Sequence, residues 1–144
     1  MCIRDRYKNA QSTDRLALAT ACVIIAVATF YLPVQHPLHH SIPPADHPDE
    51  DPSLRFYDIA MQVLDRHVTD VRKYTMELVE LHLVRCHYLM LSKKDGEAIW
   101  AIKGDLVTMA TAMGLHRDPG KWKMSREVAE RRRWAWWNIV YLER

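Results

Sequence analysis

The sequence predicts an all-α fold, a multi-helical array of about five antiparallel helices that makes up part of a domain. The composition favours helix over sheet, because only four glycines and two phenylalanines stand among many Leu, Ala, Met and Glu residues. Apolar residues recur at spacings of three and four along most of the chain, which is the period of a helix. No segment shows a convincing strand pattern, so helical hairpins in a bundle or a solenoid are expected.

The totals limit the function classes. The 144 residues suffice for at most one ordinary domain, and 49% hydrophobic residues are enough to build a core. The net charge of +2 gives no electrostatic case for a nucleic-acid-binding domain, which would be strongly basic. The three cysteines, Cys2, Cys22 and Cys86, are widely spaced and include no Cys-x-x-Cys pair. They therefore predict neither a zinc site nor a disulfide framework, and they suit a reducing compartment.

The first helix is expected from about Asp14, capped by Ser12 or Thr13, to Tyr31, where a proline soon ends it. Residues 16–32 are 17 consecutive residues without a charge. A membrane-spanning helix needs about 20 predominantly apolar residues, so this stretch is at the short edge. A signal peptide would need small residues at its cleavage site, and they are missing at the end of this stretch. We therefore expect an apolar, fully buried core helix, with a membrane span and a targeting segment as the alternatives.

Residues 33–53 are expected to form a loop or linker, because six prolines and a run of acidic residues cannot form helix or central strand. Its histidines and two of its acidic residues could take up a transition metal. These residues are His36, His39, His40, His47, Asp46 and Asp49. A flexible loop loses much conformational entropy when it organises ligands, so a solvated His-rich loop is the favoured interpretation.

The next two helices are expected at about 54–68 and 70–91. Ser53 would cap the first, and Thr69 or Asp70 the second. The first carries one apolar stripe, made of Tyr57, Met61, Leu64 and Val68. The second has two stripes, so it should pack between neighbouring helices in a layered array. One stripe consists of Val71, Thr75, Leu78, Leu81 and Tyr88, and the other of Met76, Val79, Leu83, Cys86 and Met90.

A polar turn at 92–96 precedes the fourth helix, which is expected at about 97–113. Its apolar residues recur at spacings of three and four. Gly114 stands where a left-handed C-terminal cap is favoured, and Pro119 blocks continuation of the helix.

The fifth helix is expected to start at its cap, Ser125, and to run to the end of the chain. Residues 121–133 hold six basic residues, and tryptophans flank them, a combination that could suit phosphates and stacked bases. The favoured interpretation is structural, with a buried helix face made of Trp134, Trp137 and Tyr141. The arginines at the start of this helix can pair with acids such as Asp118 or stack on tryptophans. Nucleic-acid binding and a nuclear-import or partner patch are the alternatives.

No pattern supports catalysis. The four glycines are too scattered for a phosphate-binding loop, and no nucleophile occupies a recognisable elbow. His82 and His87 are five residues apart on a helix, which excludes the usual metal-binding pair at a spacing of four. His67 is interpreted as a helix-end residue. We therefore expect no enzyme activity, no metal site and no cofactor in this chain.

Both ends suggest a fragment. Residues 1–13 show no periodicity, and an artefactual or disordered start is expected. The last residues stop inside an apolar helical pattern without the Gly, Asn or Pro that would end it. Residues 54–144 are therefore expected to be the C-terminal part of a helical domain that is truncated at its end.

Two motifs at a defined spacing carry a family resemblance. The first is Trp100-x-x-x-Gly104, then Ala110-x-x-x-Gly114-Leu115-His116-Arg117-Asp118-Pro119, and the second is Glu130-x-Arg132-Arg133-x-x-Trp136-Trp137. Together they resemble the fungal-specific transcription factor domain, the middle homology region of zinc binuclear-cluster regulators, including xylanolytic-activator types. In that family the first motif closes one helix and the second opens the next. The resemblance covers 54–144 well and includes 14–32 as the preceding core helix.

Four positions depart from the family pattern. Thr108 stands where arginine is frequent, Leu106 where a small residue is usual, and Trp134 where a third arginine is common. Glu143 replaces the aspartate of the usual closing Leu-Asp-Arg. None of these changes affects helix formation or burial, so they concern fine function rather than membership.

The motif residues have a mainly architectural interpretation. Gly104 would let a neighbouring helix approach closely, while Gly114 would supply a cap over which Leu115 folds back. The polar residues 116–118 can bond orphan groups at the helix end or pair with the next helix. A small-molecule effector pocket lined by these residues is the alternative.

The resemblance implies a fungal nuclear regulator of genes transcribed by RNA polymerase II. DNA would be bound by a six-cysteine zinc cluster upstream of this chain, so zinc would be a cofactor of that cluster, and the chain alone is not expected to bind DNA specifically. A homodimer, co-regulator proteins and a small-molecule effector are the candidate partners, and no membrane is expected. The alternatives are a generic helical interaction scaffold and a membrane-anchored protein that uses residues 16–32.

Overall fold

The computed structural model describes the backbone of residues 3–42 and 51–144, and their side chains from residue 14 onward. Over these ranges the chain forms five α-helices and two short 3-10 helices and contains no strand, which confirms the all-α prediction. The chain divides into two compact units. We call residues Met1–Arg72 the hairpin unit and residues Lys73–Arg144 the three-helix unit.

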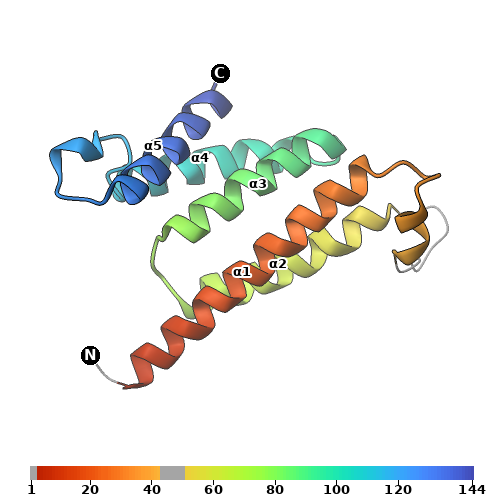
Figure 1. Ribbon diagram of the computed structural model, residues 1–144, viewed down its shortest axis with the longest axis horizontal. Coiled ribbons are helices and arrows are strands. Elements are labelled where there is room, and N and C mark those ends of the chain that lie inside the picture. Colours follow the sequence, from red (N-terminus) through yellow and green to blue (C-terminus); the bar gives the residue numbers. More distant parts are fainter. Residues whose placement is uncertain (1–2, 43–50) are drawn as a thin grey trace. The chain divides into compact units, whose positions relative to one another are not determined.

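The hairpin unit consists of α1 (Ile3–Tyr31), the 3-10 helix η1 (Pro37–Ser41) and α2 (Pro52–Asp70). α1 and α2 lie side by side in opposite directions (Figure 1). α1 begins at Ile3, upstream of the expected start near Asp14, and residues 1–2 lie outside the described part of the chain.

One stripe of α1 is buried, and its other side chains from residue 14 onward are exposed or half-buried. The buried residues recur every three or four positions, as on a helix that packs against one neighbour. They are Leu16, Ala19, Cys22, Val23 and Ala26. Leu18, Ile24 and Ile25 are exposed. The window Asp14–Tyr31 is long and apolar enough to cross a membrane by length and composition alone, and 28% of it is buried. The prediction of a fully buried core helix is therefore wrong, because within this unit α1 packs along one helix, α2.

α2 starts with Pro52 in its first turn and Asp51 as its N-cap. The carboxylate of Asp51 accepts the backbone N–H of Ser53 at 2.9 Å, so the cap lies two residues before the predicted one. The buried face of α2 comprises Ser53, Tyr57, Ala60, Leu64 and His67. His67 thus takes the inward position that the sequence pattern assigned to Val68, which is half exposed. Arg15 of α1 and Asp70 of α2 form an ion pair across the hairpin.

α3 (Met76–Ser92) begins six residues later than expected, because α2 continues to Asp70 and residues 71–75 belong to no helix. Thr75 is the N-cap, and its hydroxyl accepts the N–H of Leu78 at 3.3 Å. Val71 and Thr75 therefore leave the predicted stripes. The remaining residues of both stripes are buried except Met76 and Met90, which confirms burial on two sides of the helix.

α4 (Gly96–Ala112) and α5 (Arg126–Leu142) complete the three-helix unit, and both contact α3 and each other. Asp95 caps α4 by accepting the N–H of Ala98 at 2.9 Å. Ser125 caps α5, as predicted, by accepting the N–H of Val128 at 3.3 Å. A connection with the 3-10 helix η2 (Pro119–Lys121) joins α4 to α5.

Candidate functional site at the junction of α4 and α5

The C-terminus of α4 ends in two nested backbone hydrogen bonds around Gly114. The N–H of Leu115 donates to the carbonyl of Ala110 at 2.8 Å, and that of Gly114 donates to Thr111 at 3.0 Å. This is the Schellman arrangement, which needs a residue in the left-handed region after the helix. Gly114 has φ of 68°, as the sequence predicted. Leu115 and Ala110 are both buried, as expected for the apolar contact that accompanies such a cap.

The connection after Gly114 is shaped by Asp118. Its Oδ1 accepts the backbone N–H of Gly120 at 3.0 Å and so caps η2. A Cβ atom at Gly120 would lie 3.3 Å from both Arg133 Nη2 and Asp118 Oδ2, so only glycine fits without a shift. The bond from Gly120 and the guanidinium of Arg133 hold the pKa of Asp118 below its ordinary value, so this carboxylate stays ionised.

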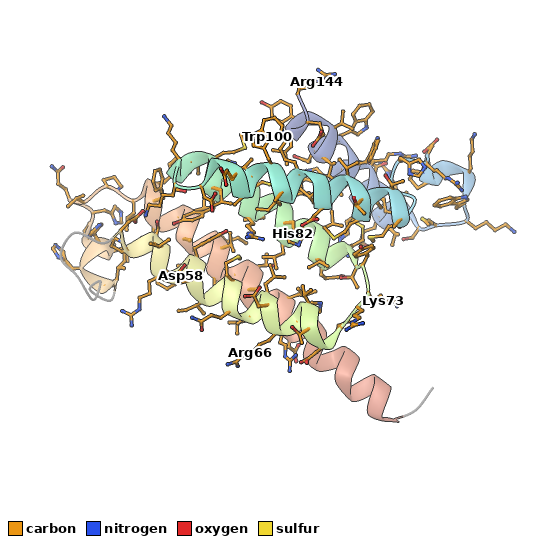
Figure 2. The ribbon with its side chains drawn as sticks, turned by 180° about the vertical axis from the view of Figure 1, so that it is seen from behind. Asp58, Arg66, Lys73, His82, Trp100 and Arg144 are labelled. Atoms are coloured by element: carbon orange, nitrogen blue, oxygen red, sulfur yellow. The ribbon has the colours of Figure 1, made fainter. Side chains whose placement is uncertain are left out.

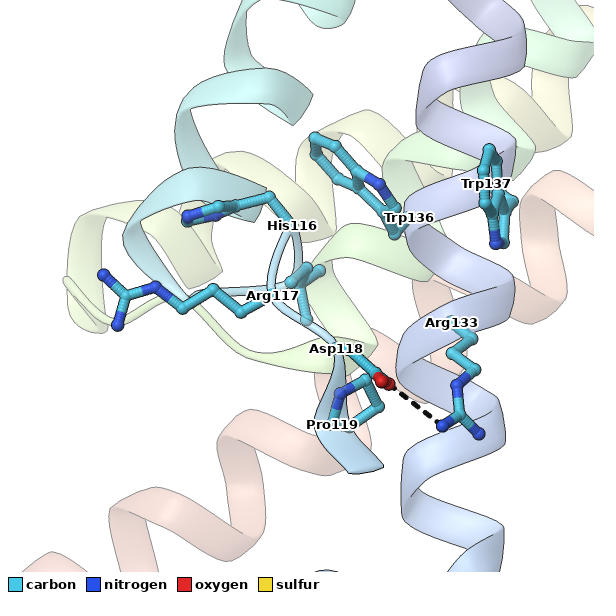
Figure 3. Close-up of a pocket in the computed structure, with 8 residues that line it drawn as sticks. His116, Arg117, Asp118, Pro119, Arg133, Trp136 and Trp137 are labelled. Carbon is cyan, nitrogen blue, oxygen red and sulfur yellow. Dashed lines mark hydrogen bonds and ion pairs between the residues drawn. The ribbon is translucent and has the colours of Figure 1, made fainter. Parts of the chain in front are cut away.

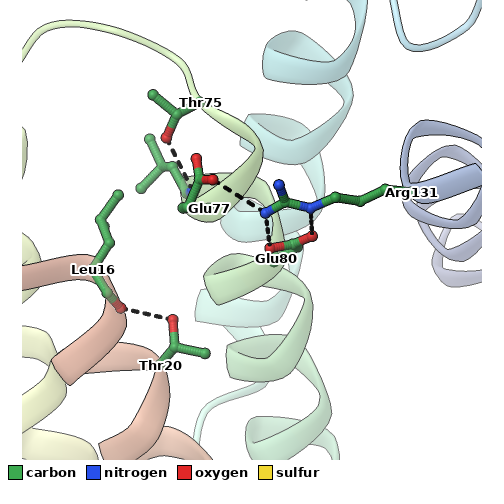
Figure 4. A network of polar contacts seen from close by, with 7 residues as sticks. Leu16, Thr20, Thr75, Glu77, Glu80 and Arg131 are labelled. Atoms are coloured by element: carbon green, nitrogen blue, oxygen red, sulfur yellow. Dashed lines mark hydrogen bonds and ion pairs between the residues drawn. The ribbon is translucent and has the colours of Figure 1, made fainter. Parts of the chain in front are cut away.

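Three consecutive arginines in the second turn of α5 bind three different parts of the three-helix unit. Arg131 holds α3: its Nε donates to Glu80 Oε1 at 2.6 Å, while its Nη2 donates to Glu80 Oε2 at 2.7 Å and to Glu77 Oε1 at 3.2 Å (Figure 4). This bidentate geometry suits a guanidinium and a carboxylate. Hydrogen bonds and charge from the two glutamates raise the pKa of Arg131.

Arg132 holds the end of α4. Its Nη2 donates to the carbonyl of Met113 at 2.7 Å, one of the carbonyls that a helix leaves without an internal partner. Its guanidinium also lies over the ring of Trp122, with its carbon 5.6 Å from the ring centre. The buried Nε of Arg132 has no hydrogen-bond partner among the described residues.

Arg133 holds the connection. Its Nη2 donates to Asp118 Oδ1 at 3.0 Å, and its Nη1 donates to Glu130 Oε1 at 2.6 Å, one turn earlier on α5. The pairing of the α5 arginines with Asp118 and their stacking on tryptophan are thus as the sequence predicted. The hydrogen bonds to Asp118 and to Glu130, together with the charges of both acids, raise the pKa of Arg133.

A groove of about 320 Å³ lies between the connection and α5 (Figure 3). It is lined by Leu115, His116, Arg117, Asp118, Pro119, Arg133, Trp136 and Trp137. The side chain of Asp118 points toward Arg133, whereas that of Arg117 points away from α5 (Figure 3). The rings of His116 and Trp136 meet edge to face with centres 6.1 Å apart. The groove therefore combines an aromatic wall with an ion pair, in which Asp118 and Arg133 bind each other.

The structure brings most of the motif residues together at this junction. Gly114, Leu115, His116, Arg117 and Asp118 lie in the connection opposite Glu130, Arg132, Arg133, Trp136 and Trp137 of α5. Ala110 supplies the buried last turn of α4. Trp100 is 72% exposed near the other end of α4 (Figure 2). A Cβ at Gly104 would meet no atom within 4 Å, so the predicted close approach of a neighbouring helix at Gly104 is wrong.

The buried face of α5 also differs from the prediction. Trp134, Trp137 and Tyr141 are 53%, 64% and 74% exposed. The buried residues are Ala129, Ala135 and Ile139. Because alanine lets helices pack closely, the inward line of α5 follows its small residues rather than its large aromatic ones.

Several important residues were not found from the sequence. The hydrogen bonds from Arg131 to Glu77 and Glu80 join residues more than 50 positions apart. The sequence indicated them only through the spacing of three between the two glutamates, which places both on one face of α3. His67 and His82 are both buried, and burial lowers the pKa of each, that of His82 to about 4. Neither ring nitrogen of His67 has a hydrogen-bond partner among the described residues.

Among the described residues no three His, Cys, Asp or Glu side chains gather as metal ligands do. His36 uses its Nδ1 to accept the N–H of Leu38 at 3.2 Å, which caps η1. His39 and His40 lie in η1, whereas His47, Asp46 and Asp49 fall outside the described residues.

Comparison with known proteins agrees with the motif resemblance. The family model of the fungal specific transcription factor domain matches residues 4–144. An uncharacterized transcriptional regulatory protein of Schizosaccharomyces pombe is 36% identical over 67 residues, which are 46% of this chain and 8% of that relative. The match thus spans a small part of the relative's length, and no solved structure matches the chain. Because the family model covers nearly all of the sequence, the chain belongs to the fungal specific transcription factor domain family, whose members regulate transcription.

Proposed function

We propose that this chain is the regulatory middle region of a fungal zinc-cluster transcription factor, which acts in the nucleus on genes transcribed by RNA polymerase II. The family match over residues 4–144 carries the proposal. The description of the S. pombe relative as a transcriptional regulatory protein supports a role in regulation.

Within the chain, regulation would act through the junction of α4 and α5. The cap of α4 is held by Arg132, and the connection is held by Arg133. Polar contacts between a helix end and the next helix can be strengthened or released by a bound partner, because a single contact of this kind contributes little to the total stability of the fold. The junction is thus suited to relay a binding event to the rest of a regulator.

The proposal assigns DNA binding to a six-cysteine zinc cluster in another part of the full-length protein. Cys22 and Cys86 of this chain are both buried, on α1 and α3, which supports a structural role for their thiols. The chain by itself should then show no sequence-specific DNA binding in a gel-shift assay at physiological salt. A specific complex that survives competition by unrelated DNA would overturn this assignment.

A reporter assay with the full-length regulator tests the role of the junction. Replacing Arg132 and Arg133 by Leu should change transcription of the reporter several-fold without changing DNA binding. Arg126→Leu, at an exposed position in the first turn of the same helix, is the matched control and should leave transcription unchanged. Unchanged transcription in the double variant, with normal protein levels, would favour a generic helical scaffold.

Effector binding in the groove beside α5 is a second candidate function. The observation that favours it is the aromatic wall formed by Trp136 and Trp137 next to the Asp118–Arg133 pair. A fragment library screened by ligand-observed NMR should give hits that Trp136→Ala abolishes and Trp100→Ala retains. Hits that are insensitive to Trp136→Ala would contradict binding at this groove.

A further inference from the structure

The outward face of α1 carries a regular pattern that the packing inside the hairpin unit does not use. Leu18, Ala21, Ile25 and Ala28 are all exposed and recur at spacings of three, four and three. Each follows a buried residue of α1 by two positions, which is about 200° around a helix. They therefore form one stripe on the side of α1 that is opposite its contact with α2. We call these four residues the α1 seam.

The α1 seam alternates large and small side chains with a seven-residue repeat. Leu18 and Ile25 are seven residues apart, and so are Ala21 and Ala28. This is the spacing by which two helices pack knobs into holes. The neighbouring residue Ile24 is also exposed, which widens the apolar surface.

The pattern is complementary to itself in one orientation. When two α1 helices lie antiparallel and cross level with Val23, Leu18 faces Ala28 of the partner subunit, and Ile25 faces Ala21 of the partner subunit. Every large side chain then meets a small one, which fills space evenly. In a parallel pair large residues would face large ones and alanines would face alanines. The alternation therefore selects a twofold, antiparallel arrangement.

The absence of charge supports the same partner. Residues 16–32 contain no charged side chain, so two identical faces can meet without repulsion or an unpaired buried charge. A lipid surface fits less well. A helix that lies in a membrane interface carries a strongly polar or basic face. The other side of α1 is instead an apolar stripe packed on α2, a helix with Arg55, Asp58 and Arg66.

We propose that the α1 seam is a self-association surface, on which a second copy of this chain packs its own α1 in antiparallel orientation. The resulting dimer would bury Leu18 and Ile25 of each copy against the alanines of the other. This proposal does not depend on the proposed regulatory function.

Sedimentation of the full 144-residue chain tests the proposal, with Ile25→Glu as the disrupting variant. The unaltered chain should be dimeric, and Ile25→Glu should raise the dimer Kd by at least about tenfold, because it buries a charge. Ile59→Glu is the matched control: Ile59 lies on α2 and is 40% exposed, against 43% for Ile25. It should leave the dimer intact. A chain that stays monomeric at all concentrations, or a dimer that Ile25→Glu does not weaken, would overturn the proposal.

Enlarging the small residues distinguishes the specific pairing from general stickiness. Ala28→Leu should weaken the dimer, because leucine would then face Leu18 of the partner subunit. A nonspecific apolar association would instead become tighter with the added apolar area. Circular dichroism checks that the variant keeps its helix content, which an exposed Ala-to-Leu change should preserve. A tighter dimer in Ala28→Leu contradicts the antiparallel register.

Cross-linking tests the register directly. In a Cys2→Ser background, the double variant Ala21→Cys with Ile25→Cys should form an intermolecular disulfide under mild oxidation. Ala21→Cys alone should not, because residues 21 of the two copies would lie four positions apart along the helix pair. Equal cross-linking of both variants, or binding of a monomer to phosphatidylcholine vesicles in place of dimerisation, would overturn the proposal.

Discussion

In the hairpin unit, α1 and α2 are joined by an apolar stripe and the Arg15–Asp70 pair, whereas in the three-helix unit arginines of α5 bind α3, the end of α4 and the connection. The family motif residues lie entirely in the three-helix unit. The hairpin unit, by contrast, keeps a charge-free apolar face exposed. Directed polar contacts are thus concentrated where the motif fixes one helix end to the next, whereas α1 leaves apolar side chains exposed.

The largest expected effect concerns the inward face of α5. Ile139→Ala should lower the free energy of unfolding by about 2–5 kcal/mol, because Ile139 is 2% exposed and its removal leaves a cavity. Trp137→Ala, on the exposed face, should change it by less than about 0.5 kcal/mol. Urea unfolding followed by circular dichroism measures both. If Trp137→Ala lowered the free energy of unfolding more than Ile139→Ala does, the aromatic face of α5 would be the buried one.

The second prediction concerns acid sensitivity, which both units share through a buried histidine. Burial, with a smaller contribution from the charge of Arg85, lowers the pKa of His82 from 6.5 to about 4, while Asp105 opposes the shift. As the pH falls, the unfolded chain therefore takes up a proton on this histidine at a higher pH than the folded chain does. The contribution of neutral His82 to stability is complete above pH 6.5 and is lost as the pH falls toward 4. The expected loss is on the order of 3 kcal/mol.

His82→Leu should flatten this pH dependence in the three-helix unit, while His87→Leu, at an exposed position of the same helix, should not. His67→Leu should act in the same direction in the hairpin unit, because burial also lowers the pKa of His67. Thermal unfolding between pH 4 and pH 8 checks all three. An unaltered slope in both His82→Leu and His67→Leu would refute the role of the buried histidines.

A third prediction compares two glycines of α4 and its cap. Gly114→Ala should destabilise the three-helix unit by about 1–2 kcal/mol, because φ of 68° strains any residue with a Cβ. Gly104→Ala should stabilise it by up to about 1 kcal/mol, because Gly104 lies inside α4 with open space around it. Opposite signs in urea unfolding confirm the assignment; destabilisation by both would mean that Gly104 is in a closer contact.

The smallest effect separates the two kinds of ion pair. Arg131→Lys should cost roughly 0.5–1 kcal/mol, because lysine cannot reproduce the fork that binds Glu80 with two hydrogen bonds. Arg15→Lys should cost less, since a single bond joins Arg15 to Asp70. Both effects should shrink at 1 M NaCl. Equal costs for the two variants would remove the distinction between the units.

The sequence predicted the helical fold and two of the cap residues, Ser125 and Gly114, because caps are local signals, but it misplaced the caps of α2 and α3. Ser125 and Gly114 act at the predicted positions through bonds to residues at most five apart. The start of α3 was misplaced because Thr69 and Thr75 are both chemically suited to cap a helix, and only the structure shows which one does. The local sequence pattern does not distinguish between these two cap positions.

The junction was predicted in outline and its geometry only in part. Pairing of Asp118 with the α5 arginines followed from charge and proximity in sequence, whereas the bond from Arg131 to α3 depends on how the helices pack. The orientation of α5 was missed for a related reason. Periodicity identifies stripes, but both the alanine line and the tryptophan line have helical spacing, and tertiary packing chose the former.

The hydrogen bond from Arg132 to the carbonyl of Met113 has a consequence for the order of folding. The glycine cap of α4 joins residues at most five apart, while the arginine must close a loop of 19 residues before it can reach the same helix end. Loop closure costs more entropy as the separation grows. The end of α4 can therefore form early, and the docking of α5 then adds the bond from Arg132. If translation or refolding stalls before residue 132, this helix end has its glycine cap but lacks the hydrogen bond from Arg132 to the carbonyl of Met113.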